Sequence, residues 1–417
     1  MKKKIIILTQ WFDPEPAYRG ADFAASLVAA GYDVEVVTGF PNYPGGRVYS
    51  GFKLRPIKKT MSQEGYGLTR LFLYPSHNHS KLGRIANYLS FFFSALIYLC
   101  VMPRKVDLVY VYHPPLTVGL AAAVAKFFRR WPIVLDIQDL WPDTLQATGM
   151  ISNKRVLGIV ARAANWLYGR TDHIVVQSWG FRHRLLKRGV EDAKVSVVIN
   201  WSKGTPTIGV SLPNPFPDPK KFRILFSGNM GRAQALDSVL LTAQKISKDT
   251  PDVGFYFLGD GLEKKTLQAQ ASQLELSNVT FLVRVSAINV IPYLVHADAL
   301  LVHLSKNPLF DITIPSKTQE YFRIGKPILM GVSGDAARLV NEAKAGIVFP
   351  PEDPDAMVKA IKRLISMPQK DRLEIGRSAK IYSANQLSEK NGMAHFTGIF
   401  EDLISKRQVN PDRGWKN

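Results

Sequence analysis

The stretch RILFSGNMGRAQALDSVLLTAQKISKDTPDVGFYFLGDG, residues 223–261, contains the pattern on which the fold prediction depends. Its apolar run at 223–227 predicts a buried strand, and the segment 235–248 has the apolar spacing of a helix. A second apolar run at 253–259 predicts another strand, and glycines follow both strands. A strand, a helix and a second strand in this order are typical of a parallel sheet covered by helices.

The same alternation continues in both directions along the chain. Toward the C-terminus, the pattern predicts strands at 279–283, 299–304, 326–331 and 346–350, with helices between them and a helix over 353–367. Toward the N-terminus, it predicts strands at 5–9, 33–38, 107–112, 133–137 and 173–178, and helices over 20–30, 117–128 and 155–168. The fold class is therefore α/β, with two doubly wound domains in tandem.

A proline-rich stretch between Lys203 and Lys221 interrupts this pattern, and we interpret it as an interdomain linker. The sequence predicts an N-terminal domain at 1–203, a linker at 204–221 and a C-terminal domain at 222–385. The segment 386–417 has a helical pattern followed by a polar tail, and its helix is expected to cross back to the first domain.

Bulk properties indicate a globular protein of the cytoplasm. The length of 417 residues favours two domains, and a composition with 46% hydrophobic and 21% charged residues excludes disordered and fibrous classes. A single cysteine, Cys100, excludes internal disulfides and fits a reducing compartment. The apolar run near the N-terminus is too short for a signal peptide and predicts a buried strand.

The formal net charge of +20 is concentrated in the first half of the chain. Residues 1–203 contain 27 lysines and arginines against 13 aspartates and glutamates. Such a domain attracts an anionic partner, which could be a phosphate-bearing substrate, an acidic membrane surface or nucleic acid. The basic residues are scattered, and no zinc, helix-turn-helix or aromatic-basic signature accompanies them, so nucleic acid is not expected as a partner.

One apolar segment, from Ile85 to Pro103, leaves three interpretations open. It contains no charged residue and is close to the roughly 20 apolar residues that cross a bilayer. Asn87 dilutes it, and a span would cut the sheet of the first domain in two. The segment is a transmembrane helix, a buried core helix, or a helix that packs on the sheet and lays one face on the bilayer. The last alternative suits the flanking basic residues Lys81, Arg84, Arg104 and Lys105.

The loop GNMGRAQAL, residues 228–236, is a candidate phosphate site because ligands bind at the carboxyl ends of strands in such sheets. Asn229 lies in this loop, and Gly231 lets the backbone turn tightly before the next helix. The N–H groups at a helix N-terminus bind phosphate, and Arg232 adds positive charge. An ordinary turn with no ligand is the alternative.

The segment FDITIPSKTQEYFRIGKPILMG, residues 310–331, is the strongest candidate site. Ser316 is expected to cap a helix, and the three-residue spacing brings Lys317 and Glu320 onto one face of it. Lys317 is then placed to meet a phosphate, and Glu320 to accept hydrogen bonds from the two hydroxyls of a ribose. The alternative is a capped surface helix without a ligand.

Three candidates in the first domain also follow strands. His113 ends the strand at 107–112 and precedes two prolines, which favours a position at a binding cleft. Asp136 and Asp139 lie close together at the end of the next strand and are candidates to orient an acceptor hydroxyl or take its proton. Structural roles remain open for all three. The pair His77 and His79 lacks further ligands, so no metal site is predicted.

In their order, VYHPP (111–115), DIQDLWPD (136–143), FSGNMGRAQALDSVL (226–240) and PSKTQEYFRIGKPIL (315–329) resemble motifs of the retaining glycosyltransferases of family 4. The resemblance covers roughly residues 4–400. It is strongest to the bacterial polysaccharide branch, which includes O-antigen N-acetyl-L-fucosamine transferases and colanic-acid transferases.

This resemblance implies a GT-B fold with two facing Rossmann-like domains, the acceptor mainly on the first and the sugar nucleotide mainly on the second. It implies that Arg232 and Lys317 hold the donor diphosphate and that Glu320 holds the ribose. It also implies that His113 lies near the donor sugar and Gly20 near the diphosphate.

Two departures from the family pattern limit the comparison. Ile312 stands where the wider family has a second glutamate, and Asp311 is a candidate to replace it. The helix that follows Arg232 lacks the lysine-glycine of the wider family, since residues 234–236 are Gln-Ala-Leu. The sugar contacts and part of the phosphate clamp therefore do not follow from the resemblance.

These observations predict an enzyme that moves a sugar, such as N-acetyl-L-fucosamine, from a UDP-type nucleotide to a lipid-diphosphate-linked saccharide acceptor in surface polysaccharide synthesis. Retention of configuration, no cofactor and no essential metal are expected. The expected location is cytoplasmic, peripheral on the inner face of the cytoplasmic membrane, with the nucleotide sugar and an acidic membrane surface as partners. The alternatives are a GT-B sugar-nucleotide epimerase and a non-enzymatic nucleic-acid-binding protein.

Overall fold

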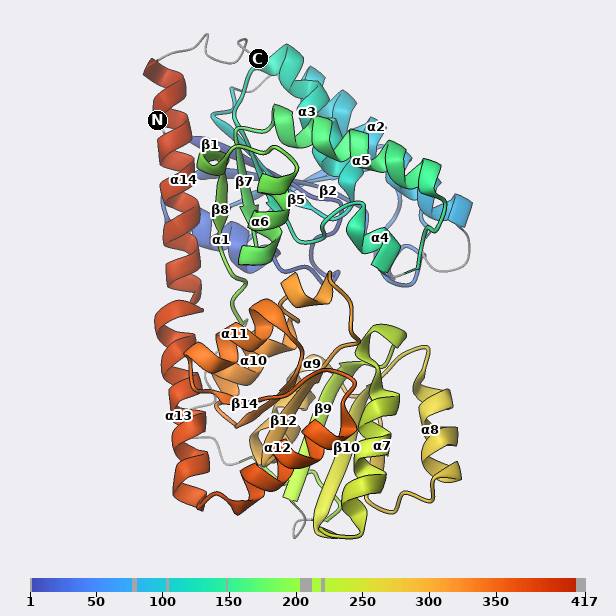
Figure 1. The fold of residues 1–417 in the computed structure, drawn as a ribbon. Helices are drawn as coiled ribbons and strands as arrows, with labels where there is room; N and C mark the ends of the chain where they lie inside the picture. The colour runs from blue at the N-terminus through green and yellow to red at the C-terminus, as the bar shows by residue number, and fades with distance from the viewer. Residues whose placement is uncertain are drawn as a thin grey trace. The chain divides into compact units, whose positions relative to one another are not determined.

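The computed structural model describes residues 2–76, 81–102, 105–147, 149–202, 212–218 and 222–409, which form two compact units (Figure 1). Unit 1 comprises Met1–Gln177, Phe181–Val198 and Gly392–Asn417. Unit 2 comprises Ser178–Gly180 and Ile199–Asn391. Both are α/β units with a parallel-dominant sheet between helices, so the predicted fold class is confirmed.

The sheet of unit 1 has the strand order β3-β4-β2-β1-β5-β6-β7-β8. Its strands are β1 (Lys4–Leu8), β2 (Asp33–Gly39), β3 (Ile57–Met61), β4 (Gly67–Leu71), β5 (Leu108–His113), β6 (Ile133–Ile137), β7 (His173–Val176) and β8 (Val195–Val197). All neighbours are parallel except β3 and β4. The five predicted strands are present within two residues, whereas β3, β4 and β8 were not predicted.

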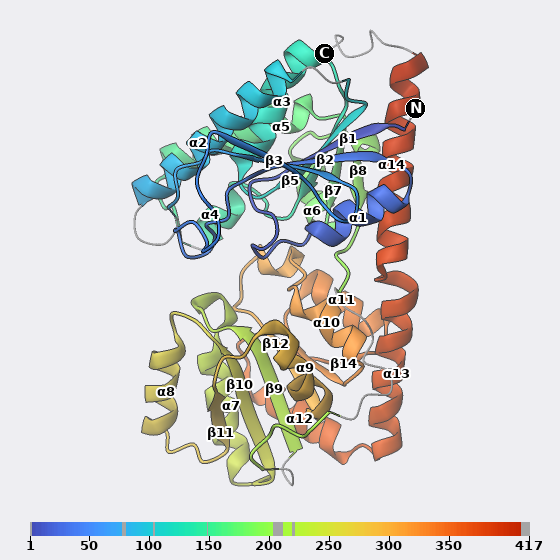
Figure 2. The same ribbon diagram turned by 180° about the vertical axis from the view of Figure 1, so that it is seen from behind.

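Helices cover both faces of this sheet. Those before the C-terminal region are α1 (Ala21–Ala29), α2 (Lys81–Val101), α3 (Leu116–Arg129), α4 (Asp143–Ala147), α5 (Lys154–Arg170) and α6 (Trp179–Lys187). The helices α2, α3 and α5 lie side by side on one face, as both ribbon views show (Figures 1 and 2). On the other face, Phe23 of α1 and Phe396 pack against Tyr110 of β5 with ring centroids 5.0 and 5.6 Å away.

Unit 2 contains a fully parallel six-stranded sheet in the order β11-β10-β9-β12-β13-β14. The strands are β9 (Phe222–Asn229), β10 (Val253–Asp260), β11 (Val279–Leu282), β12 (Ala299–His303), β13 (Ile328–Gly331) and β14 (Gly346–Val348). Each corresponds to a predicted strand. The order reverses between β9 and β12, and ligands of open parallel sheets bind at such a point.

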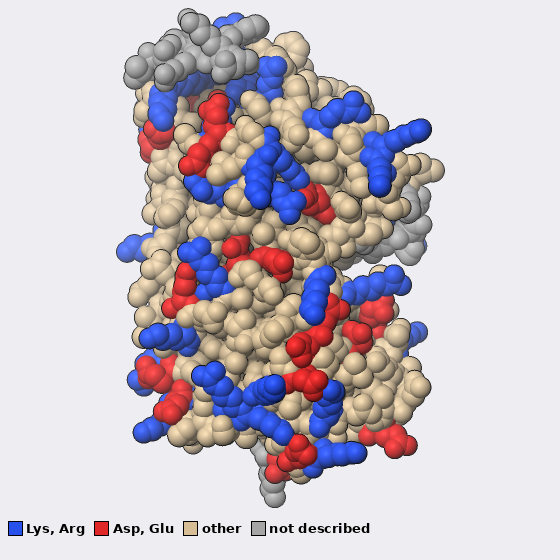
Figure 3. Space-filling view, in the orientation of Figure 1, with Lys and Arg blue, Asp and Glu red and all other residues tan. Residues whose placement is uncertain are grey.

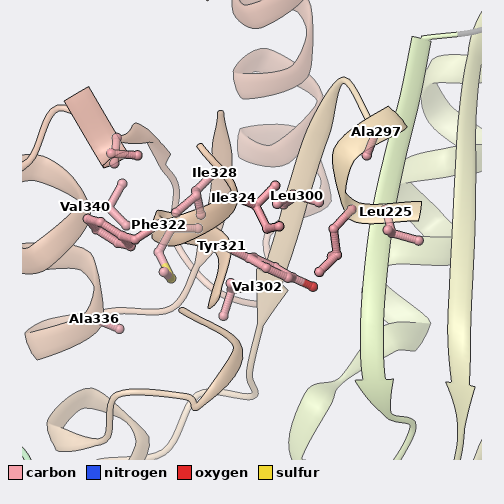
Figure 4. Close-up of a cluster of buried hydrophobic side chains, with 14 of the residues drawn as sticks. Leu225, Ala297, Leu300, Val302, Tyr321, Phe322, Ile324, Ile328, Ala336 and Val340 are labelled. Carbon is pink, nitrogen blue, oxygen red and sulfur yellow. The ribbon is translucent and has the colours of Figure 1, made fainter. Parts of the chain in front are cut away.

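Two apolar cores lie on the two faces of this sheet. The helices of unit 2 are α7 (Leu236–Ser247), α8 (Lys264–Gln273), α9 (Ala287–His296), α10 (Lys317–Ile324), α11 (Gly334–Glu342), α12 (Pro354–Ser366) and α13 (Gln369–Gln386). On one face, Tyr321 and Phe322 of α10 pack with Leu225 and Leu300 of the sheet (Figure 4). Burial of these rings fixes α10 against the sheet, and α10 carries Lys317.

The C-terminal helix returns to unit 1, as predicted. It is α14 (Glu389–Val409), which begins three residues later than expected and follows the separate helix α13. From Gly392 onward it belongs to unit 1, where Phe396 and Phe400 contact the ring of Tyr110. The side chain of Arg407 donates a hydrogen bond to the carbonyl of Val106 at 3.0 Å. These contacts attach α14 to the first sheet.

The predicted linker at 204–221 lies mostly outside the described residues. Its described part, 212–218, contains no helix or strand. Phe216 nevertheless packs edge-on against Tyr256 of β10, with the ring centroids 4.6 Å apart. The later part of this segment is therefore attached to the core of unit 2.

Candidate functional site

A cavity of about 450 Å³ lies at the carboxyl edge of the unit 2 sheet. This size is typical of small-molecule sites. Its polar lining comes from the end of β9 and the loop after it, the end of β12, and the start of α10 with the turn before it. These residues are Ser227, Asn229, Gln234, His303, Thr313, Ser316, Lys317, Glu320 and Tyr321. Two segments singled out from the sequence, 228–236 and 310–331, therefore meet at one site.

Lys317 places an unpaired positive charge in this cavity. Its Nζ is buried and has no hydrogen-bond partner among the described residues. The nitrogen lies 3.5 Å from the centroid of the Phe226 ring, which supplies a cation–π contact but no counter-charge. Desolvation lowers the pKa of Lys317 to about 7. An anionic group that enters the cavity would provide the missing partner.

Gly228 makes room for this ammonium group. Its φ of +136° is a conformation that side-chain-bearing residues rarely adopt. A Cβ atom at this position would lie 3.2 Å from Nζ of Lys317. The glycine near the end of β9 is therefore explained by the lysine it faces as well as by the turn.

Glu320 lies on the same side of α10 as Lys317, as the three-residue spacing predicts. Its carboxylate accepts hydrogen bonds from Arg323 and from the hydroxyl of Ser202, which hold it in place at the cavity wall. Ser316 occupies the N-cap position of α10, but its side chain makes no capping hydrogen bond. The predicted cap was therefore wrong in its bonding, and Ser316 lines the cavity instead.

The glycine-rich loop contains a turn that the sequence did not predict, although the helix after it begins within one residue of its predicted start. A short 3₁₀ turn over Arg232–Gln234 follows Gly231, and α7 begins at Leu236. The side-chain oxygen of Gln234 accepts the Gly231 N–H at 3.0 Å and lies 3.5 Å from Nδ2 of Asn229. One N–H of the expected phosphate cradle is thus bonded to the protein itself. Asn229 is exposed and lines the cavity.

Arg232 is not brought together with Lys317. Its side chain is 94% exposed and forms an ion pair with Glu263 at 3.3 Å. It does not line the cavity. A role for Arg232 at a ligand therefore requires its guanidinium to leave Glu263.

His303 lines the cavity and was missed in the sequence analysis. Its Nδ1 lies 2.8 Å from the carbonyl of Gln234, and its Nε2 accepts the Glu352 N–H at 3.2 Å. These partners require the proton on Nδ1, and desolvation lowers the pKa, so the ring is neutral. The strand-end rule that singled out His113 also applies to His303, the last residue of β12.

In unit 1, His113 ends β5 and is fully buried. Neither ring nitrogen has a hydrogen-bond partner in the described part of the chain. Burial lowers the pKa of His113 to about 4, so the imidazole is neutral and retains one donor and one acceptor. The ring lines neither of the two cavities found among the described residues, so contact with a ligand stays a prediction.

Asp136 and Asp139 have different environments. Asp136 is fully buried and accepts hydrogen bonds from Arg19, Tyr110 and Gln138 at 3.0, 2.5 and 2.6 Å. Its carboxylate is bonded within the protein and is not exposed to an acceptor. Asp139 is partly exposed, and desolvation raises its pKa to about 6. Asp139 is therefore the better placed of the two predicted carboxylates to meet a hydroxyl.

Gly20 is the N-cap residue of α1. The first N–H of this helix, from Ala21, is bonded to the carboxylate of Asp13 at 2.6 Å. One of the free N–H groups that would bind an anion beside Gly20 is therefore already occupied. Its φ of −94° places no requirement for glycine on this position.

Ile312, which replaces a glutamate of the wider family, belongs to a short turn in unit 2. Its carbonyl accepts the Ser178 hydroxyl at 2.5 Å, and its side chain fills the space beside Gly180. Asp311 does not line the cavity. Among the described residues, no group of three or more His, Cys, Asp or Glu side chains is arranged to hold a metal ion. The pair His77 and His79 lies outside the described residues.

Two protein families match most of the chain. Residues 17–201 match the Glycosyl transferase 4-like domain, and residues 213–382 match Glycosyl transferases group 1. The chain also has two Rossmann-like units, and the second contains a cavity. It is therefore a glycosyltransferase of the GT-B fold that carries these two domains.

Curated relatives are similar over most of their length. Probable glycosyltransferase WbjE of Pseudomonas aeruginosa is 24% identical over 350 residues, which are 81% of this chain and 85% of the relative. Putative colanic acid biosynthesis glycosyl transferase WcaI of Escherichia coli is 26% identical over 387 residues, which are 89% and 92%. The crystal structure of Anabaena Alr3699/HepE with UDP and glucose has a TM-score of 0.67 at 16% identity and covers 96% of this chain and 100% of that one. The last likeness concerns the fold alone.

Proposed function

We propose that this glycosyltransferase transfers a sugar from a UDP-type nucleotide donor held in the unit 2 cavity. The observation that carries the proposal is the buried ammonium of Lys317, which has no partner among the described residues. A buried unpaired charge costs free energy unless a ligand compensates it, and a diphosphate is a strong compensating ligand. The UDP in the similar Anabaena structure supports this choice of donor.

The charge of the leaving diphosphate is the main quantity that the site must stabilise. Lys317 is fixed by the packing of α10, so it stabilises the developing negative charge without reorganising during the reaction. Glu320 is the proposed ribose ligand, because its carboxylate is oriented by Arg323 and Ser202. Transfer with retention and without an essential metal or cofactor is proposed from the family resemblance.

The acceptor is proposed to bind unit 1, where the neutral His113 and the partly exposed Asp139 follow neighbouring strands. Asp139 would orient the acceptor hydroxyl. A saccharide carried on a lipid diphosphate fits the basic character of the first half of the chain. The name of one curated relative, a colanic acid biosynthesis glycosyl transferase, supports a role in bacterial surface polysaccharide synthesis. The proposed location is the inner face of the cytoplasmic membrane. The proposed sugar is an N-acetylated deoxyhexosamine such as N-acetyl-L-fucosamine.

A donor screen tests the proposal. The purified enzyme is incubated with individual nucleotide sugars and a synthetic polyprenyl-diphosphate saccharide, and products are identified by mass. We expect one sugar to be added from a UDP donor by the wild type and almost none by Lys317→Met. Full activity of Lys317→Met would disprove the proposed site. Formation of an epimerised nucleotide sugar from the donor alone would show that the enzyme is an epimerase and not a transferase.

A further inference from the structure

Helix α2 presents a continuous row of exposed apolar side chains. Leu82, Ile85, Leu89, Phe93, Ile97 and Val101 are between 44% and 78% exposed. Their spacing of three or four residues places them along one side of the helix. Monomeric proteins rarely leave a contiguous apolar surface of this kind in contact with water, so the row indicates an interaction surface.

The opposite side of α2 is anchored in unit 1. Phe91, Ala95 and Leu99 are fully buried, and Asn87 is hydrogen-bonded to Gln10 and Asn42. Among the described residues, α2 is the one helix long and apolar enough to cross a membrane, and 28% of its apolar window is buried. The helix also connects β4 to β5 of a single sheet. The structure thus contradicts the purely buried helix, and the anchored inner side argues against a span.

The apolar surface extends onto two neighbouring helices. Phe127 and Phe128 at the end of α3 are 46% and 72% exposed, and Ile159 of α5 is 58% exposed. Phe127 stacks on Trp166 of α5 with the ring centroids 6.2 Å apart. Because α3 packs between α2 and α5, these residues continue the same layer (Figure 2). We call the exposed side of α2, α3 and α5 the outer helix face.

The charge of these three helices has one sign. They contain no aspartate or glutamate, and their basic residues are Lys81, Arg84, Lys126, Arg129, Lys154, Arg155, Arg162 and Arg170. In the part of this face that Figure 3 shows, lysine and arginine side chains stand among uncharged ones. An apolar surface interspersed with basic residues alone is complementary to a bilayer that contains anionic lipids.

The end of α2 is adapted to the same environment. The guanidinium of Arg129 donates hydrogen bonds to the carbonyl of Cys100, in the last turn of α2, and to that of Met102, just after the helix. Carbonyls at a helix end otherwise need water, which is scarce at the acyl boundary of a bilayer. Arg129 therefore satisfies a carbonyl of the last turn of α2 and the one that follows this helix, which suits a position at this boundary.

We propose that the outer helix face is a monotopic docking surface for an anionic lipid bilayer, with α2 lying in the plane of the interface. Apolar side chains of α2 and the aromatic residues of α3 and α5 enter the acyl boundary, and the arginines of α5 contact lipid phosphates. The docking surface rests on the proposed function in one respect, which is that the acceptor is carried on a lipid. The binding of the enzyme to the bilayer itself is independent of the sugar donor.

Co-flotation with vesicles tests the docking surface. The full chain is mixed with vesicles of phosphatidylcholine containing phosphatidylglycerol, and the bound fraction is compared with that of Leu89→Ser/Phe93→Ser/Ile97→Ser. We expect the partition coefficient of the triple variant to fall by at least about tenfold, because three exposed apolar side chains no longer enter the lipid. Circular dichroism and UDP affinity should be unchanged, because these side chains project away from the core.

A matched variant in unit 2 separates this effect from general surface hydrophobicity. Leu373 and Ile381 of α13 are 63% and 53% exposed, and Leu373→Ser/Ile381→Ser should bind vesicles as the wild type does. Arg155→Gln/Arg162→Gln should weaken binding to the anionic vesicles and leave binding to pure phosphatidylcholine unchanged. The corresponding control is Lys359→Gln/Arg363→Gln on α12, with no expected change.

Three results would overturn the proposal. If the wild-type protein did not bind anionic vesicles, a lipid bilayer would not be the partner of this surface. If the triple variant bound vesicles as strongly as the wild type, the outer helix face would not be the docking surface. A dimer in light scattering that the triple variant abolishes, without vesicle binding by the wild type, would identify a second copy as the occupant. Loss of vesicle binding with intact UDP binding leaves the donor site unaffected, so failures of the two proposals are distinguishable.

Discussion

Unit 1 and unit 2 each place a basic side chain after a strand of a parallel sheet, but they treat its charge in opposite ways. In unit 1, Arg19 is 1% exposed and its Nε lies 3.0 Å from the fully buried carboxylate of Asp136. In unit 2, the Nζ of Lys317 is buried with no hydrogen-bond or ion-pair partner among the described residues. The first charge is neutralised within the protein and the second is not.

The difference separates a structural ion pair from a binding group. Burial alone lowers the pKa of Arg19, but the charge of Asp136 outweighs it and raises the pKa. For Lys317 desolvation acts alone, and the pKa falls to about 7. Strong pKa perturbation without a built-in partner, in a cavity, is typical of functional groups. The comparison therefore predicts that mutations in the first pair affect stability and that mutations of Lys317 affect activity.

The largest expected effect is on stability. Asp136→Ala leaves the guanidinium of Arg19 buried without its counter-charge, and breaking a buried ion pair in this way costs about 3–5 kcal/mol. Unfolding of unit 1 should therefore shift to a much lower urea concentration, as measured by hydrogen exchange of peptides from β5 and β6.

The matched control removes both charges. Arg19→Met/Asp136→Leu should recover most of the lost unfolding free energy, because no uncompensated charge remains. If Asp136→Ala lowered the unfolding free energy by less than about 1 kcal/mol, the pair would behave like an exposed salt bridge. Its assignment as a structural ion pair would then be wrong.

The next effect is on activity. Lys317→Met removes the charge that faces the leaving diphosphate and keeps most of the side-chain volume. Turnover should fall by about 10²–10³-fold, as for loss of one preorganised electrostatic group in other enzymes. The melting temperature should stay the same or rise, because an unpaired buried charge is removed. Steady-state kinetics and thermal unfolding of the same preparation measure both quantities.

Lys264 provides the control for this variant. Its Nζ donates hydrogen bonds to the carbonyls of Gly259 and Leu282 at 2.9 and 3.3 Å. Lys264→Met should therefore lower the melting temperature and leave turnover per folded molecule nearly unchanged. If both lysine variants showed the same pattern, the distinction between paired and unpaired cations would carry no functional meaning.

The sequence predicted which candidates lie at the sheet edges but not which were already bonded. The spacing of Lys317 and Glu320 fixes a common helix face, and the end of a strand fixes the position of His113. Whether a carboxylate is free depends on partners distant in sequence. Asp136 binds Arg19, which is 117 residues away, and no local pattern encodes that contact. Asp139, three residues later, has the same local sequence environment and a different outcome.

For the fold, too, the sequence predicted what local patterns determine and missed what depends on distant contacts. Buried parallel strands were predicted within two residues because their apolar runs are continuous. The strand β3 was missed because all five of its residues are exposed and it pairs only with β4 at the sheet edge. The sequence left an exposed side of α2 as one of three interpretations, since the composition of this helix is equally compatible with a buried helix. Packing against α3 decides which side remains free.

A third prediction concerns the pH dependence that the unpaired Lys317 causes. The pKa of Lys317 is about 7 in the folded state and near its ordinary 10.5 in the unfolded chain. Between these values the unfolded state binds more protons, so the unfolding free energy contributed by this group rises with pH above about 7. Binding of a diphosphate requires the charged form, so UDP affinity should decline as pH rises through the same range.

Calorimetry distinguishes this titration from others. UDP binding near pH 8 should take up protons, which is measured as a dependence of the apparent enthalpy on the ionisation enthalpy of the buffer. Lys317→Met should abolish this dependence, and Asp139→Asn should leave it unchanged. Proton release by the wild type, or uptake that persists in Lys317→Met, would assign the linkage to another group.

The smallest expected effect concerns Arg232, which the family resemblance places on the diphosphate. Its side chain is 94% exposed and paired with Glu263, so it must exchange one partner for another and lose side-chain freedom when it reaches a ligand. We expect Arg232→Ala to raise KM by no more than about fivefold, with an effect that diminishes at high salt, and to leave the melting temperature unchanged. The kinetics are measured beside those of Lys317→Met over a range of salt concentration. A loss as large as that of Lys317→Met would mean that the turn Arg232–Gln234 rearranges around the nucleotide and that unit 2 builds half of its phosphate site only when the donor binds.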